Sequence, residues 1–347
     1  MRIGILTGGG DCPGLNAVIR AVCRRSFKRG HEVRGFFDGW RGVLTDQWID
    51  IDPERIRGIL TLGGTILHSS GDNPVYEADG PERVMETMRR NDIEALIVVG
   101  GEGTMRGAHE MWTRHKMPVI GVPKTIDNDL PGTDQTVGFD SALQVATEAL
   151  DRLHTTAESH NRVMVCEVMG RTAGWIAFHS GLASGADVIL LPELDMSVEE
   201  AADVIRRRHE SDGKTYSLVV VGEGYRLSST SGLFDDLTET PQLDAYGYPR
   251  LGGVSHHVAR AIEQLTGFDT RVTILGHVQR GGTPSAADRV LASRFGYLAA
   301  DLADRGVFGR MTALRGSDVT DVPIEESTGP ARVVPDEWVR FIRGFMG

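Results

Sequence analysis

The chain has 347 residues and a formal net charge of −11 at neutral pH. A chain of this length is too long to fold around one small hydrophobic core, so we expect two lobes. The negative charge argues against nucleic acid as a main partner, and no apolar run approaches the roughly 20 residues of a membrane span. The sequence opens directly on a predicted strand, and its three cysteines lack metal-ligand spacing. We therefore expect a cytoplasmic protein with unpaired thiols and no membrane partner.

The first predicted strand, residues 3–6, leads into a glycine-rich stretch, residues 7–16, and then into a helix over 17–28. A strand, a glycine turn and a helix N-terminus together favour anion binding, because backbone N–H groups can approach a phosphate closely. The stretch matches neither the P-loop pattern nor the dinucleotide-binding pattern. It therefore predicts either a phosphate cradle or a simple tight turn.

A second unit of the same kind follows. The continuous apolar run 93–99 is typical of a strand in a parallel sheet, and it ends in the sequence Gly-Gly-Glu-Gly-Thr before a helix predicted over 105–116. The carboxylate in this turn, Glu102, is placed where it could reach a phosphate-bound Mg²⁺. The alternative is an acid that only stabilises the helix N-terminus.

The stretch 121–134 combines three carboxylates, Asp127, Asp129 and Asp134, with the cation Lys124. It follows an apolar run, 117–122, that we interpret as a buried strand. Carboxylates this close repel one another unless a metal, a cation or a proton in transit compensates their charge. Such a group suits proton abstraction from a hydroxyl and Mg²⁺ binding near phosphates, although a polar loop with capping Asp residues is the plainer interpretation.

The remainder alternates between strands and helices. The predicted strands are 163–168, 188–191, 217–221 and 271–275, and the predicted helices are 141–159, 174–182, 197–209, 254–264 and 286–304. Residues 197–200, with the sequence Ser-Val-Glu-Glu, resemble a capping box at the start of the helix over 197–209. Residues 225–249 are rich in Ser, Thr, Asp and Gly, and we interpret them as an inserted loop. The alternation predicts an α/β fold with mostly parallel sheets. In such sheets ligands bind at the carboxyl ends of the strands, where the motifs above lie.

Together the motifs resemble the phosphofructokinase family over nearly the whole chain. The matching stretches are residues 6–11 with 13–16, 100–104, 123–129, 160–162, 167–171, 222–223 and 275–282. The resemblance implies two three-layer α/β lobes with the active site in the cleft between them. It assigns the phosphoryl donor to residues 1–138 with about 279–329, and the sugar phosphate to 139–278 with about 330–347. It also implies a homo-oligomer, a tetramer or dimer with shared active sites.

The resemblance assigns catalytic roles to individual residues. Asp127 matches the general base that takes the proton from the sugar's 1-hydroxyl, and Thr125 and Asp129 match its neighbours around that hydroxyl and the metal. Arg171 matches a residue beside the transferred phosphoryl group. The sugar itself would meet a further set: Met169 and Gly170 against its ring, Glu223 on its hydroxyls, and Arg162, Arg271, His277 and Arg280 around its 6-phosphate. Guanidinium groups suit a dianion because they donate in pairs. Arg162 and Arg271 would come from a neighbouring subunit.

For the donor, the resemblance implies an ATP site and a magnesium cofactor. The donor residues would be Gly9, Gly10, Gly101, Glu102, Gly103, Thr104 and Lys124, with Mg²⁺ near Glu102 and Asp129. Gly103 resembles ATP users, because the missing side chain leaves room for the α-phosphate. Lys124 resembles the branch that also contains pyrophosphate users. We therefore expect ATP and fructose 6-phosphate as substrates in glycolysis, with pyrophosphate as the alternative donor.

Two departures from the family keep other hypotheses open. Gly71 stands where the family usually has an arginine that contacts the transferring phosphoryl group, and Glu102 replaces the commoner Asp. A different ketose phosphate as acceptor, or a weakly active paralogue that only binds sugar phosphate, are the alternatives. The basic cluster of the bacterial effector site is represented by Arg20 and Arg24 but is incomplete, so nucleotide or phosphoenolpyruvate regulation is not expected.

Overall fold

The computed structural model describes residues 1–211, 213–231, 233 and 251–346. Most of the predicted insertion at 225–249 lies outside the described residues. The strands are β1 (Arg2–Thr7), β2 (Glu32–Phe36), β3 (Trp48–Ile51), β4 (Ala95–Gly100), β5 (Val119–Pro123), β6 (Val163–Val168), β7 (Val188–Leu190), β8 (Ser217–Gly222), β9 (Thr270–Ile274), β10 (Arg310–Arg315) and β11 (Asp318–Pro323).

The helices alternate with these strands. They are α1 (Leu15–Lys28), α2 (Trp40–Leu44), α3 (Gly80–Arg90), α4 (Glu102–His115), α5 (Phe139–His160), α6 (Trp175–Ala183), α7 (Val198–Ser211), α8 (Val254–Thr266), α9 (Ala286–Asp304) and α10 (Asp336–Phe345), with the 3₁₀ turns η1 (Ile59–Thr61), η2 (Pro74–Tyr76), η3 (Gly276–Arg280) and η4 (Ile324–Thr328). None of the helices formed by the described residues combines the length and apolarity that crossing a bilayer requires.

The chain divides into two compact units. Unit 1 contains residues 1–126, 130–141 and 280–331, and unit 2 contains residues 127–129, 142–279 and 332–347. The chain thus enters unit 2 for three residues in the middle of the aspartate loop. The chain passes from unit 2 to unit 1 within η3 and enters unit 2 again at residue 332, where the C-terminal segment begins.

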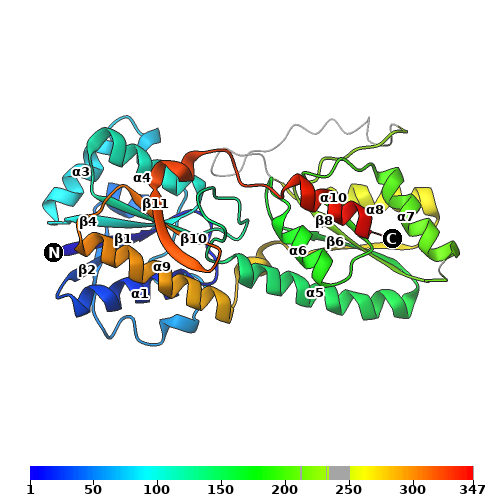
Figure 1. Cartoon of the computed structure of the whole chain (residues 1–347), viewed down its shortest axis with the longest axis horizontal. Helices are drawn as coiled ribbons and strands as arrows, with labels where there is room; N and C mark the ends of the chain where they lie inside the picture. Colours follow the sequence, from blue (N-terminus) through cyan, green and yellow to red (C-terminus); the bar gives the residue numbers. More distant parts are fainter. Residues whose placement is uncertain (212, 232, 234–250, 347) are drawn as a thin grey trace. The chain divides into compact units, whose positions relative to one another are not determined.

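Unit 1 is built on a sheet of strand order β11-β10-β5-β4-β1-β2-β3. Its central strands are parallel, whereas the edge strands β3 and β11 pair antiparallel with their neighbours. Figure 1 shows α1 and α9 on one face of this sheet and α3 and α4 on the other. Every residue of β4 is buried, as expected for a strand covered on both faces. The apolar run that predicted this strand is therefore explained by its position in the middle of three layers.

Unit 2 is built on a sheet of strand order β7-β8-β6-β9, and its strands are all parallel. The strands β6 and β8 at its centre are buried at every residue. At the start of α7, the amide of Ser197 donates to Glu200 Oε2 at 2.8 Å and the amide of Glu200 donates to Ser197 Oγ at 3.3 Å. This capping box was predicted from the sequence and is confirmed.

The α/β class with mostly parallel sheets is confirmed. The helix boundaries differ slightly from prediction: α4 begins at Glu102 instead of residue 105, so Glu102 lies in its first turn. Four parts of the fold were not predicted from the sequence: α2, β3, the β10–β11 hairpin and α10. The alternation of β11 between exposed and half-buried residues explains this in part, because a solvent-facing edge strand carries few apolar residues.

Candidate active site

The two predicted glycine turns of unit 1 lie side by side at the carboxyl ends of β1 and β4. These strands are parallel neighbours, with Thr7 opposite Val99, and the amide of Gly8 donates to Val99 O at 2.9 Å. Gly9 has a φ of +77°, a conformation that favours glycine, and its amide donates to Ser70 O at 2.9 Å. The adjacent strands therefore bring together two stretches that are about 90 residues apart in the sequence.

Thr104 fills the space between these turns. An added Cβ at Gly8 would lie 2.7 Å from Thr104 Oγ1, and one at Gly100 would lie 2.4 Å from Thr104 Cβ. Both glycines are therefore required so that the threonine can pack directly on the backbone. The indole of Trp40 donates to Thr104 O at 3.3 Å and further fixes the first turn of α4.

Lys124 is 2% exposed, and its ammonium lies against the first glycine turn. Its Nζ donates to Gly8 O at 2.9 Å and to Gly10 O at 2.5 Å. The amide of Lys124 also donates to Gly100 O at 3.0 Å. Lys124 therefore binds the first glycine turn through its side chain and the second through its backbone amide.

Gly103 differs from its neighbours because nothing lies within 4 Å of a Cβ added there. Its carbonyl accepts from Asn73 Nδ2 at 2.8 Å, so its backbone is fixed although its side-chain position is open. Gly101 is more restricted: its added Cβ would approach Lys124 O to 3.4 Å. Open space beside the first turn of α4 is thus a specific property of position 103.

Two arginines near these turns, Arg106 and Arg41, are paired with carboxylates. Arg106 forms an ion pair with Glu102 one turn away on α4. Beside Gly71, where the resemblance implies an arginine, Arg41 pairs with Asp72 at 2.9 Å. Arg41 was not predicted as a site residue, and its ion pair with Asp72 places it next to the turn that contains Gly71.

Unit 2 positions a second group of predicted residues at the carboxyl ends of β6 and β8. Glu223 Oε1 accepts from the amide of Gly170 at 3.2 Å and from the amide of Arg171 at 2.9 Å. Arg171 has a φ of +56°, which is unfavourable for a residue with a side chain. An added Cβ at Gly224 would lie 1.9 Å from Arg171 O. The turn therefore depends on the carboxylate of Glu223 and on glycine at 224.

Burial raises the pKa of Glu223, the amide of Arg171 lowers it, and the charge of Asp127 raises it. Asp127 is itself 8% exposed. The two predicted carboxylates thus belong to one electrostatic environment within unit 2. The charge of Asp127 therefore acts on the same carboxylate that binds the amides of Gly170 and Arg171.

Met169 is held by a residue that the sequence analysis missed. Its amide donates to Gln279 Oε1 at 2.9 Å, and Gln279 is completely buried in η3. Arg332, which was also not predicted, binds the aspartate loop: its amide donates to Asp129 O at 2.6 Å. Neither could be identified from the sequence, because each contact joins segments more than 100 residues apart.

The four residues predicted for the 6-phosphate lie at three places in the structure. Arg162 donates to Asp269 Oδ2 at 2.5 Å, and Arg271 forms an ion pair with the same carboxylate. His277 is exposed in η3. Arg280 belongs to unit 1, where its guanidinium donates to Asp11 O at 3.2 Å. The structure therefore groups Arg162 with Arg271, and it places Arg280 beside the first glycine turn.

The predicted metal ligands, Glu102 and Asp129, belong to unit 1 and unit 2 respectively. Within the described ranges, no three His, Cys, Asp or Glu side chains gather as a metal site. Mg²⁺ typically keeps several waters and uses one or two carboxylates together with substrate phosphates. Each of these two carboxylates by itself offers the oxygen donors that this mode of binding uses, and Glu102 is paired with Arg106.

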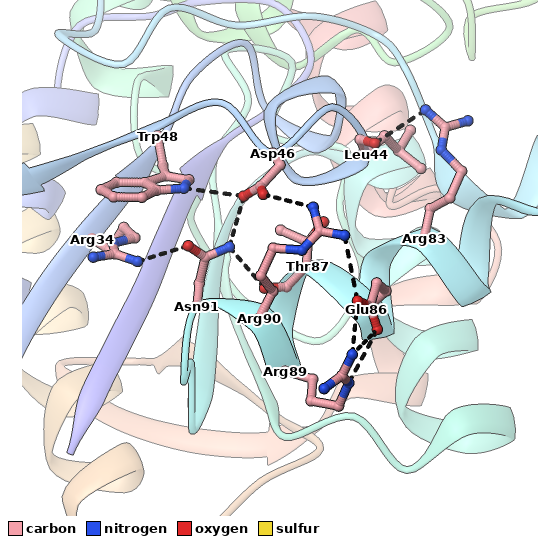
Figure 2. Close-up of polar contacts among 10 residues, drawn as sticks. All are labelled: Arg34, Leu44, Asp46, Trp48, Arg83, Glu86, Thr87, Arg89, Arg90 and Asn91. Carbon is pink, nitrogen blue, oxygen red and sulfur yellow. Dashed lines mark hydrogen bonds and ion pairs between the residues drawn. The ribbon is translucent and has the colours of Figure 1, made fainter.

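A hollow of about 470 Å³ lies elsewhere on unit 1, between α2 and α3. Figure 2 shows that its charged side chains bind one another: Arg90 pairs with Asp46 at 3.1 Å, and Arg90 and Arg89 both contact Glu86. Asn91 donates to Asp46 at 2.7 Å and extends the network to Arg34. No predicted site residue lines this hollow, and its paired charges indicate a structural network.

Comparison with known proteins agrees with this arrangement. A family model described as Phosphofructokinase matches residues 2–303. The chain is 50% identical to "Pyrophosphate--fructose 6-phosphate 1-phosphotransferase" of Streptomyces coelicolor, with all of both chains covered. It is 48% identical to "ATP-dependent 6-phosphofructokinase 3" of the same organism, with 97% of each covered. Among solved structures, phosphofructokinase of Saccharomyces cerevisiae matches with a TM-score of 0.80 and 32% identity over 94% of this chain.

The chain belongs to the phosphofructokinase family, and the resemblance seen in its motifs is confirmed. Membership of this family supports phosphofructokinase activity, with a sugar phosphate and a phosphoryl donor as substrates. Relatives of nearly equal identity carry names that specify different donors. The chain spans 45% of the yeast chain, whereas it spans the two Streptomyces relatives almost completely.

Proposed function

We propose that this protein transfers a phosphoryl group from ATP to the 1-hydroxyl of fructose 6-phosphate, with Mg²⁺ as cofactor. The observation that carries the choice of ATP is the open space at Gly103. A nucleotide needs room for its α-phosphate and nucleoside beyond the two phosphates that pyrophosphate also has. At Gly103 the backbone is fixed by Asn73 and nothing lies within 4 Å of an added Cβ.

On the acceptor side, Asp127 takes the proton of the sugar's 1-hydroxyl as the hydroxyl oxygen attacks the terminal phosphorus of ATP. The bond from that phosphorus to the bridging oxygen breaks, and ADP leaves. Arg171, on the turn held by Glu223, donates to the transferring group. Mg²⁺ near Glu102 and Asp129 would supply charge neutralisation to the donor phosphates. Catalysis then depends mainly on positioning and electrostatics.

Pyrophosphate is the second candidate donor, and Lys124 is the observation that favours it. A buried ammonium beside the glycine turn adds positive charge where a small, highly charged anion would bind. However, Nζ of Lys124 already donates to the carbonyls of Gly8 and Gly10. We therefore interpret it chiefly as a residue that shapes the turn, and this role serves either donor.

The test is an initial-rate assay of the purified chain with fructose 6-phosphate and Mg²⁺, comparing ATP with pyrophosphate. Turnover with ATP alone is the expected result. Turnover with pyrophosphate alone would contradict the argument from Gly103. Turnover with neither, while fructose 6-phosphate still binds, would reject the acceptor assignment, and other ketose phosphates would then be assayed in its place.

A further inference from the structure

Arg332, in the C-terminal segment of unit 2, binds the backbone of the aspartate loop. Its amide donates to Asp129 O at 2.6 Å, and its guanidinium Nη1 donates to Asn128 O at 3.1 Å. Two successive carbonyls of the loop are therefore bound by the backbone and the side chain of the same residue. About 200 residues of sequence separate the partners, so this contact is a product of tertiary structure.

The guanidinium of Arg332 is itself held in place. Its Cζ lies over the Trp175 ring, 4.0 Å from the ring centroid, where a cation is attracted by the face of the aromatic ring. The indole Nε1 of Trp175 donates to Arg332 O at 2.9 Å, and Trp175 is 2% exposed. A buried aromatic ring thus fixes both the backbone and the side chain of Arg332.

The carboxylate of Glu193 binds the backbone near both Trp175 and Arg332. Glu193 Oε1 accepts from the amide of Gly174 at 2.9 Å, next to Trp175, and from the amide of Val334 at 3.0 Å, two residues beyond Arg332. The start of α6 and the C-terminal segment are therefore joined independently of the arginine side chain. Removing the guanidinium should leave this attachment in place.

The loop that Arg332 contacts is locally strained. Asn128 has a φ of +53° and is 3% exposed, and it lies between the two carboxylates of the loop, Asp127 and Asp129. A non-glycine residue keeps this conformation only where its surroundings enforce it. The hydrogen bonds from Arg332 to the carbonyls of Asn128 and Asp129 act on the two peptide groups that follow.

We propose that Arg332 is a positioning residue for phosphoryl transfer. It fixes the backbone of Asn128 and Asp129 and thereby the direction in which the Asp127 carboxylate points. This inference rests on the proposed role of Asp127 as general base. A carboxylate displaced by about 1 Å can lose about 100-fold in rate, because proton transfer depends on geometry.

The experiment compares Arg332→Ala with Arg343→Ala, using whichever donor supports turnover. Arg343 belongs to the same C-terminal segment and binds Asp195 O at 3.2 Å and Glu200 at 2.6 Å, far in sequence from the loop. We expect Arg332→Ala to lower kcat by about 10- to 100-fold with KM for fructose 6-phosphate within about threefold. Arg343→Ala should keep kcat within about twofold. Added methylguanidine should restore several-fold of the lost kcat in Arg332→Ala only.

Arg332→Lys provides a second variant that keeps the positive charge and N–H donors but loses the guanidinium over the Trp175 ring. Its kcat should remain at least about fivefold below that of the parent enzyme. The inference is overturned if Arg332→Lys has the parent kcat, if Arg332→Ala keeps kcat within about twofold, or if Arg343→Ala loses as much. It is also overturned if methylguanidine has no effect on a folded Arg332→Ala protein, as judged by its melting temperature.

Asp127→Asn, assayed in parallel, separates this inference from the proposed function. If Asp127→Asn keeps more than about a tenth of the turnover, the general-base assignment fails and the positioning role fails with it. If Asp127→Asn abolishes turnover while Arg332→Ala does not lower it, only the positioning role is rejected.

Discussion

The glycine turns of unit 1 and the carboxylate turn of unit 2 are both placed at the carboxyl ends of parallel strands, but they are built differently. In unit 1 the side chains of Thr104 and Lys124 pack against backbone, so the available surface consists of backbone and open space. In unit 2 the carboxylate of Glu223 holds the turn of Arg171, and Asp127 shares its electrostatic environment.

The two turns should therefore select their ligands in different ways. Where backbone forms the surface, the ligand is selected by the room that remains, and a single added side chain can change the choice. Where side-chain charges form the surface, the chemistry depends on protonation and on orientation to within about 1 Å. The proposed donor side and the proposed acceptor side should therefore respond differently to substitution.

The largest effect is expected at the acceptor side. Asp127→Asn keeps the size of the side chain but removes its capacity to accept the proton, so kcat should fall about 1,000-fold. Binding of fructose 6-phosphate, measured by calorimetry, should change by less than about threefold. Asp134→Asn, an exposed aspartate of the same loop whose carboxylate accepts from Gly316 N, is the matched control. Equal losses in both variants would reject a special role for Asp127.

At the donor side, Lys124→Met should act mainly on the glycine turn. The carbonyls of Gly8 and Gly10 lose a charged donor, and we expect the free energy of unfolding to fall by about 2 kcal/mol. Urea titration measures this change, with Lys116→Met at an exposed position as control. If the lysine instead costs free energy through its buried charge, the variant will be as stable as the parent protein or more so, and our interpretation of Lys124 will be wrong.

Gly103→Asp tests selection by open space. The added carboxylate should weaken ATP binding by about 10- to 30-fold through size and charge repulsion, with a smaller effect on pyrophosphate. Gly103→Ala is the control for size alone, because a Cβ meets nothing within 4 Å there. KM values for both donors measure the effect. An unchanged KM for ATP in Gly103→Asp would show that the nucleotide does not approach this residue.

The smallest expected effect is a pH dependence of stability on the acceptor side. Burial raises the pKa of Glu223 in the folded protein, so folding favours its protonated form. The associated stability is present below the unfolded pKa and is lost as the pH rises through the folded pKa. The melting temperature of Glu223→Gln, relative to the parent protein, should therefore increase between pH 4 and pH 7. Glu158→Gln, at an exposed position of α5, provides the reference; a parallel trend in both would contradict the prediction.

Local sequence signals were sufficient for most elements that precede residue 304. A continuous apolar run identified β4, and the Ser197–Glu200 pair identified the start of α7. The β10–β11 hairpin and α10 were not found. Each is stabilised by partners distant in sequence, such as the pairing of β10 with β5, and carries a weaker local pattern.

The sequence by itself determined the class of fold, the family and the identities of the candidate site residues, because glycine turns and carboxylates at strand ends are local features. The tertiary structure alone decided how these residues are held. Lys124 binds the carbonyls of a turn more than 100 residues earlier, and Arg332 binds those of a loop about 200 residues earlier. Hydrogen bonds of this range depend on the final path of the chain, which no local pattern of residues specifies.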